Sequence, residues 1–221
     1  MHRDWLLWQI VDSAFPTGGF AHSNGLETAK QAGQVRTEDD LLDFSQVVLQ
    51  QAAETVLPYV EEVYQLPDTL TQVDQHCDAF LVNPVANRAS RAQGNGLLVA
   101  AAAAFPDEAI AELKSTARSE QWPSHVAPMY GAVFQQLDIP LEDVRRSVMY
   151  VTLRTVLSAA IRLNIIGPLR SQALQHALAP LAERLLARHS VTDYRRVAQS
   201  APVLDLWQSS HDRLYSRLFH S

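Results

Sequence analysis

The chain has 221 residues, of which 47% are apolar, which is enough to bury the core of one domain. Its formal net charge of −6 argues against general binding to nucleic acid. The longest apolar run, Leu97–Phe105, is about half a membrane span, and no basic region leads into an apolar run at the N-terminus. Cys77 is the only cysteine, so the chain cannot form an internal disulfide. We therefore expect a cytoplasmic protein with no membrane segment.

Proline positions and apolar spacing predict helices along the whole chain. A Gly-rich loop at 16–20 separates the first two. The expected helices are 5–11, 26–32, one opened by Thr37 and continuing to Val56, 70–82, 85–105, 107–118, 127–137, 141–163, 169–188, 192–199, and one from Val203 towards Phe219. No strand-like alternation of useful length occurs. The prediction is one all-α domain over residues 1–221.

The segment from Leu141 to Leu163 is the strongest helix in this prediction. Between Val148 and Ile161 it is apolar almost all round, interrupted mainly by Arg154. A helix of this kind belongs at the centre of a helical bundle. A buried guanidinium there needs carboxylate or carbonyl partners, so we expect Arg154 to have a structural role.

Charge is distributed unevenly along the chain. Residues 1–80 contain thirteen acidic side chains against three basic ones, whereas the remainder is net basic. Two interpretations are open: the two parts pair with each other inside one domain, or the N-terminal part presents an acidic docking face.

Signatures of catalysis and of ligand binding are missing from the sequence. There is no P-loop and no H-E-x-x-H, and the sequence around Ser23 lacks the first glycine of a nucleophile elbow. The eight histidines are scattered and form no metal-spaced cluster with Cys77. We therefore expect no catalytic, cofactor-binding or metal-binding residues.

Two regions contain combinations of residues that a simple helical bundle does not require. In Pro16–Glu27 a Gly-Gly pair permits unusual backbone angles or a close approach by another chain, although it is equally a buried turn. Near the C-terminus one helical stripe is expected, made of Leu204, Trp207, His211, Leu214 and Leu218, with Tyr215 and Phe219 along a second edge. This segment is either an ordinary core-docked helix or an interface rich in aromatic and Arg side chains.

These regions carry a resemblance to a known family. The run Asp12-Ser13-Ala14-Phe15-Pro16-Thr17-Gly18-Gly19-Phe20-Ala21-His22-Ser23-Asn24-Gly25-Leu26-Glu27 closely resembles the N-terminal signature of the urease accessory protein UreF family, and Leu214-Tyr215-Ser216-Arg217-Leu218-Phe219-His220-Ser221 resembles its C-terminal signature. Segments 87–94, 125–131 and 162–169 also resemble family segments in the right order. The resemblance thus covers essentially the whole chain, in a form similar to that of plants and some bacteria.

The resemblance implies an all-α homodimer that serves as a urease maturation chaperone and is not an enzyme. Family members bind the accessory protein UreD (also called UreH), recruit the GTPase UreG, and deliver nickel to apo-urease. No tightly bound cofactor is implied, because nickel is the ion delivered by the complex. Two alternatives remain: a helical nickel carrier, which would need clustered ligands, and an enzyme using the His22 and Ser23 loop, which would need an acid partner.

Candidate partner-binding residues follow from the same resemblance. In the N-terminal signature they are Gly18, Gly19, Phe20, His22, Ser23 and Glu27, with Glu27 the candidate for influencing UreG. In the segment 203–221, expected to be a partner-docking helix or tail, they are Arg213, Tyr215, Arg217 and Phe219. The chain departs from many bacterial members at His22, where they have Tyr, and at His220, where they have Arg.

Overall fold

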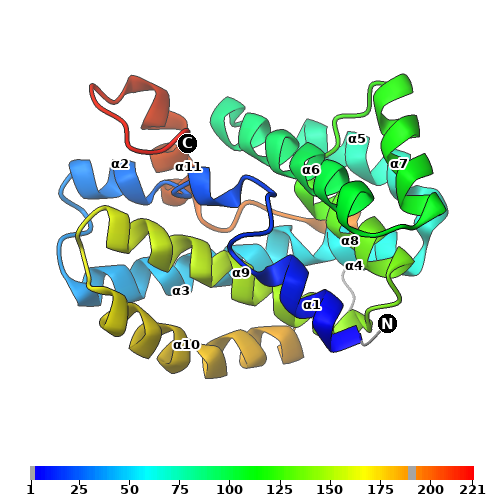
Figure 1. The fold of residues 1–221 in the computed structure, drawn as a ribbon. Coiled ribbons are helices and arrows are strands. Elements are labelled where there is room, and N and C mark those ends of the chain that lie inside the picture. The colour runs from blue at the N-terminus through cyan, green and yellow to red at the C-terminus, as the bar shows by residue number, and fades with distance from the viewer. Residues whose placement is uncertain (1–2, 189–192) are drawn as a thin grey trace.

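The structure, a computed structural model, describes residues 3–188 and 193–221, and this part of the chain contains helices and no strand (Figure 1). The α-helices are α1 (Arg3–Val11), α2 (Leu26–Gln31), α3 (Glu38–Thr55), α4 (Leu57–Gln65), α5 (Leu70–Phe80), α6 (Pro84–Ala104), α7 (Glu108–Ser119), α8 (Val126–Gln136), α9 (Leu141–Arg162), α10 (Pro168–Arg188) and α11 (Pro202–Ser210). Short 3₁₀ turns are η1 (Gly19–Ala21), η2 (Pro67–Thr69), η3 (Tyr194–Arg196) and η4 (His211–Arg213). The all-α prediction is confirmed.

Local sequence signals start several of these helices. Thr37, predicted to open the helix observed as α3, forms a capping box in which its hydroxyl accepts from Asp40 N at 3.2 Å and the Asp40 carboxylate accepts from Thr37 N at 2.9 Å. Asp107 caps α7 by accepting from the amides of Ala109 and Ile110. Each pairing satisfies backbone donors that the first turn of a helix leaves without an intrahelical partner.

Helix α9 lies at the centre of the bundle, as predicted. It runs through the middle of the view in Figure 1 and contacts α1, α2, α3, α4, α8 and α10. Helices α4 and α8 cross closely beside it, because Gly131 has no side chain: a Cβ there would lie 2.4 Å from the Val60 carbonyl oxygen. Arg154 on α9 donates to the Val11 carbonyl at the end of α1, in keeping with a structural role.

Three stretches differ from the prediction. Residues 57–65 form a separate helix, α4, which the prediction from the sequence did not include. The helix expected at 192–199 is absent from 193 onwards, where Asp193 caps only the short turn η3; residues 189–192 lie outside the described part. The C-terminal helix ends at Ser210, and after η4 the chain continues without helix to Ser221.

No helix in the described residues is both long and apolar enough to cross a membrane.

Candidate functional site

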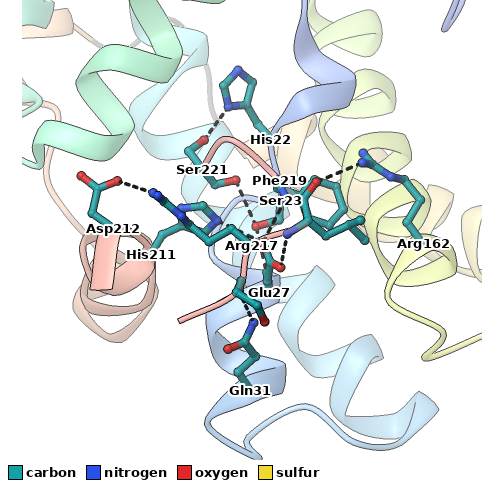
Figure 2. A network of polar contacts seen from close by, with 12 residues as sticks. His22, Ser23, Glu27, Gln31, Arg162, His211, Asp212, Arg217, Phe219 and Ser221 are labelled. Carbon is teal, nitrogen blue, oxygen red and sulfur yellow. Dashed lines mark hydrogen bonds and ion pairs between the residues drawn. The ribbon is translucent and has the colours of Figure 1, made fainter. Parts of the chain in front are cut away.

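The two signature segments, far apart in sequence, come together in space (Figures 1 and 2). The C-terminal tail, residues 214–221, folds back against the loop before α2. Backbone bonds join them: His220 N donates to Ala21 O at 2.8 Å, and Ser23 N donates to Ser221 O at 2.6 Å. We call residues 18–27 together with 211–221 the terminal site.

Glycines shape the N-terminal side of the terminal site. Gly18 and Gly25 have φ of 81° and 85°, which L side chains rarely adopt. A Cβ on Gly25 would also lie 3.3 Å from Trp207 Cβ and 3.2 Å from Gln208 Cγ. Gly25 therefore lets the start of α2 approach α11, which delivers the tail to the loop.

Glu27 is the buried centre of the terminal site. Its side chain is 3% exposed and accepts from three donors on the C-terminal segment: Leu218 N at 2.7 Å, Phe219 N at 3.2 Å and His211 Nε2 at 3.0 Å. A buried carboxylate requires such donors, and bonds to a charged acceptor are stronger than neutral ones. We call these three interactions the Glu27 clamp; they also occupy amides that a helix would have used, so the predicted C-terminal helix cannot form there.

His22 and Ser23 hold the end of the chain. His22 Nδ1 lies within hydrogen-bond distance of Ser221 Oγ, and Ser23 Oγ donates to Ser221 O at 3.1 Å. Burial, followed by the nearby His220 and His211, lowers the pKa of His22 to about 4. Both side chains thus serve the tail, and no carboxylate orients His22 for nucleophilic catalysis among the described residues.

Arg162, in the last turn of α9, joins the two segments from outside. Its guanidinium lies between two aromatic rings, 4.3 Å from the Phe20 centroid and 4.0 Å from the Phe219 centroid. It also donates to Phe20 O at 2.6 Å and to Leu218 O at 3.3 Å. One side chain of the central helix therefore ties loop and tail together (Figure 2).

The outer surface of the terminal site is aromatic and basic. Tyr215 is fully exposed and Phe20 is 62% exposed, and Arg213 and Arg217, which flank Tyr215 in the sequence, are also exposed. Arg217 makes one long ion pair with Asp212, whose carboxylate also binds Arg88 of α6.

Phe219 does not share this surface, contrary to expectation. The i, i+4 spacing with Tyr215 predicted a common edge, but residues 214–221 are not helical, so the two rings diverge. Phe219 is 4% exposed and anchors the tail in the core. Leu218, which the prediction placed in one helical stripe with Leu204 and Trp207, is half exposed, whereas Leu204 is buried.

A cavity of about 260 Å³ extends inward from the terminal site, with Ser221 and Asn24 among its lining residues. Most of its wall is apolar and includes Cys77, whose thiol pKa is raised by burial. Within the described part of the chain, no group of three or more His, Cys, Asp or Glu side chains is placed to hold a metal ion.

Opposite charges from the two parts of the sequence pair inside the fold. Glu61 of α4 binds Arg145 of α9 at 2.7 Å, and Glu38 of α3 binds Arg170 of α10 at 2.7 Å. These contacts support the first interpretation of the charge asymmetry, namely pairing within one domain.

The sequence interpretation missed three contributors: Arg162 as a link, His211 as a partner of Glu27, and the chain end at Ser221. His211 carried a usable signal, because it was the one ionisable residue in an otherwise apolar stripe and a buried imidazole needs a partner. The other two depend on tertiary placement and left no local signal.

Fold and site together define an all-helical protein in which residues 18–27 and 211–221 build a site with exposed aromatic and basic side chains, supported from within by a buried carboxylate. The family model described as UreF matches residues 35–179. "Urease accessory protein F" of Oryza sativa subsp. indica is 39% identical over 99% of this chain and 85% of its own length, and the protein of that name from Arabidopsis thaliana is 39% identical over 98% and 92%. "Urease accessory protein UreF" of Trichodesmium erythraeum is 26% identical over 96% and 94%.

The chain belongs to the UreF family of urease accessory proteins, which confirms the resemblance found in its sequence. Membership of this family supports a role in urease maturation. The relatives are named as accessory proteins and not as enzymes, in keeping with the prediction that this chain is not an enzyme.

Proposed function

We propose that the chain is a scaffold of urease maturation: as a cytoplasmic homodimer it binds UreD (UreH), helps to recruit the GTPase UreG, and assists delivery of nickel to apo-urease. Nickel is the cargo of the assembly in this proposal and not a resident cofactor of the chain. Family membership supports the pathway, and the terminal site supports the role of an adaptor within it.

The observation that carries the proposal is the construction of the terminal site. Two chain segments are fixed by many directed bonds, yet they leave Tyr215, Phe20, Arg213 and Arg217 facing outward. Aromatic and Arg side chains are the types enriched at the energetic centres of protein interfaces. An unpartnered Tyr side chain on a well-anchored tail loses little conformational freedom when a partner covers it, which favours binding.

In this proposal the signature residues divide into two roles. Tyr215, Phe20 and the two arginines contact the partner. Glu27, His22 and Ser23 are covered by the tail, so they influence partners by holding the tail in shape. Glu27, proposed from the family resemblance to influence UreG, acts indirectly in this arrangement.

The test is replacement of Tyr215 and Arg217 together by Ala, followed by co-purification with UreD and by nickel-dependent activation of apo-urease. Removing an exposed anchor pair from an interface centre weakens binding by about 10-fold to 100-fold, and we expect a loss in that range with an unchanged melting temperature. A matched control replaces Trp5 and Trp8 by Ala, since these are also exposed aromatics but lie on α1 away from the tail.

Wild-type UreD capture by the Tyr215→Ala, Arg217→Ala protein would contradict the assignment of this surface. Deletion of residues 213–221 is a harsher variant, because it also removes the buried Phe219 and the partners of Glu27. We expect it to lose UreD binding together with some stability, so the double substitution is the decisive variant.

A further inference from the structure

A second surface depression lies apart from the terminal site, between α3 and the segment that leads into α11. It has a volume of about 480 Å³ and is lined by both elements, from residues 34–50 and 200–207. None of the outward-facing residues of the terminal site lines it. We call it the α3–α11 groove.

Apolar side chains make up much of the lining of the α3–α11 groove. Phe44 and Trp207 stack there with ring centroids 5.8 Å apart, and Phe44 is buried in the core. Val47 on α3 and Val203 on α11 remain 46% and 54% exposed at its sides. Exposed aliphatic side chains and an aromatic pair in one lining give the groove apolar surface that one apolar side chain of a ligand can contact.

The walls of the α3–α11 groove carry negative charge only. Asp40 and Asp43 line it, and neither α3 (Glu38–Thr55) nor α11 (Pro202–Ser210) contains a Lys or Arg. Bonds from the backbone amides of Arg36 and Thr37 lower the pKa of Asp40, which therefore stays ionised.

Asp43 is the carboxylate available to a ligand. It is exposed on α3, one turn after Asp39, which is also exposed. The nearest basic side chain before the groove, Arg36, is turned towards the Gly33 carbonyl, to which its Nε donates at 2.6 Å. Asp40 already accepts two backbone amides and interacts with the charge of Arg36, so Asp43 carries the negative charge that a ligand can reach. An apolar depression with an exposed carboxylate at its edge is complementary to a ligand that is apolar and cationic.

We propose that the α3–α11 groove docks a short basic segment of a partner protein, in which an apolar side chain enters above Phe44 and Trp207 and a neighbouring Arg or Lys pairs with Asp43. In such a segment the apolar side chain contacts the aromatic lining, and the adjacent cation pairs with the carboxylate at the edge of the groove. This surface uses none of the outward-facing residues of the terminal site, so it gives the scaffold a second point of attachment, although Trp207 in its lining packs close to Gly25 of the terminal site.

The experiment measures fluorescence anisotropy of two labelled octapeptides, the basic GRLIRLKG and its charge-reversed counterpart GELIELEG, with the full-length protein. We expect the basic peptide to bind at least tenfold more tightly. Asp43→Lys and, separately, Val47→Asp should each weaken that binding at least tenfold, because they remove the charge and the apolar contact respectively.

Matched controls separate the groove from general attraction by an acidic protein. Glu112→Lys on α7 makes the same change in net charge, and Val99→Asp on α6 places an acid on another half-exposed Val. Both should leave the affinity within twofold of the wild type. Equal binding of the two peptides, or an equal loss in groove and control variants, would overturn the proposal.

Sedimentation velocity of the same variants tests whether the groove is occupied by a second copy of this chain instead of a segment of another protein. If Asp43→Lys and Val47→Asp both convert an oligomer to a monomer while Glu112→Lys and Val99→Asp do not, a second copy of the chain occupies the groove and the proposal of a foreign basic segment is wrong. We expect the oligomeric state to be the same in all four variants.

Discussion

The helical body and the terminal site are held together by different forces. In the body, helices α4, α8 and α9 meet through apolar side chains at close backbone distances, as where Gly131 faces Val60. In the terminal site, one buried carboxylate, Glu27, and one guanidinium, Arg162, hold an irregular tail through directed bonds. The packing of the body is spread over many apolar contacts, whereas the tail is held mainly by directed bonds and by one buried ring, Phe219, so we expect that the tail can be released without unfolding the body.

The largest loss of stability is expected from a substitution in the helical body. Gly131→Ala introduces a Cβ 2.4 Å from the Val60 carbonyl oxygen, and backbone of α4 must move to accommodate it. Overpacking of this kind costs about 3 kcal/mol, which lowers the melting temperature of a chain of this size by roughly 6–12 °C. Thermal unfolding followed by circular dichroism measures this shift.

Gly167→Ala is the matched control, because a Cβ there meets no atom within 4 Å. Its melting temperature should stay within about 2 °C of the wild type, in line with surface substitutions generally. If the two variants melted alike, close packing of α4 on α8 would not be what stabilises the body.

An intermediate effect, confined to the tail, is expected from Glu27→Gln. The amide keeps the shape of the side chain but loses the charge that three donors share, and bonds to a charged group contribute about 1.5–3 kcal/mol. Hydrogen exchange at Leu218 N and Phe219 N should accelerate at least tenfold while exchange in α9 is unchanged. UreD co-purification should fall with it.

Glu112→Gln is the control for Glu27, since Glu112 is an exposed acid on α7 outside the terminal site. It should leave both amides protected. Slow exchange at Leu218 and Phe219 in the Glu27→Gln protein would show that the clamp is not what fixes the tail, and faster exchange throughout α9 would show that the two regions are not separable.

The same contrast explains what the sequence could predict. Regular spacing and capping residues predicted α3, α7 and α9 close to their observed bounds, because those signals act within a few residues. The spacing of Leu214 and Leu218 continued the helical stripe beyond Ser210. The conformation of the tail is set instead by its contacts with Glu27. Because Glu27 lies nearly two hundred residues earlier in the sequence, these contacts leave no local pattern around the tail.

The candidate site was predicted by composition and not by geometry. Tyr215 and Arg217 were assigned to a surface, and both are exposed. Phe219 was assigned to the same surface because a helical period was assumed, and it is buried. Periodicity is informative only where the backbone is regular, so irregular ends must be located from tertiary contacts.

The smallest effect concerns pH and His22. Burial and the charges of neighbouring histidines lower its pKa from 6.5 to about 4 in the folded chain, whereas an unfolded chain takes up the proton near 6.5. Between those two values the unfolded state binds more protons, so the contribution to stability is complete above pH 6.5 and is lost as the pH falls towards 4. From pH 7 to pH 5 we expect His22 to account for a loss of about 2 kcal/mol in the free energy of unfolding, measured by urea titration against His22→Gln. His176→Gln, which changes an exposed histidine of α10, should keep the wild-type pH dependence. If His22→Gln and the wild type lost stability equally on acidification, His22 would titrate normally in the folded chain, and its contact with Ser221 would not exclude the proton.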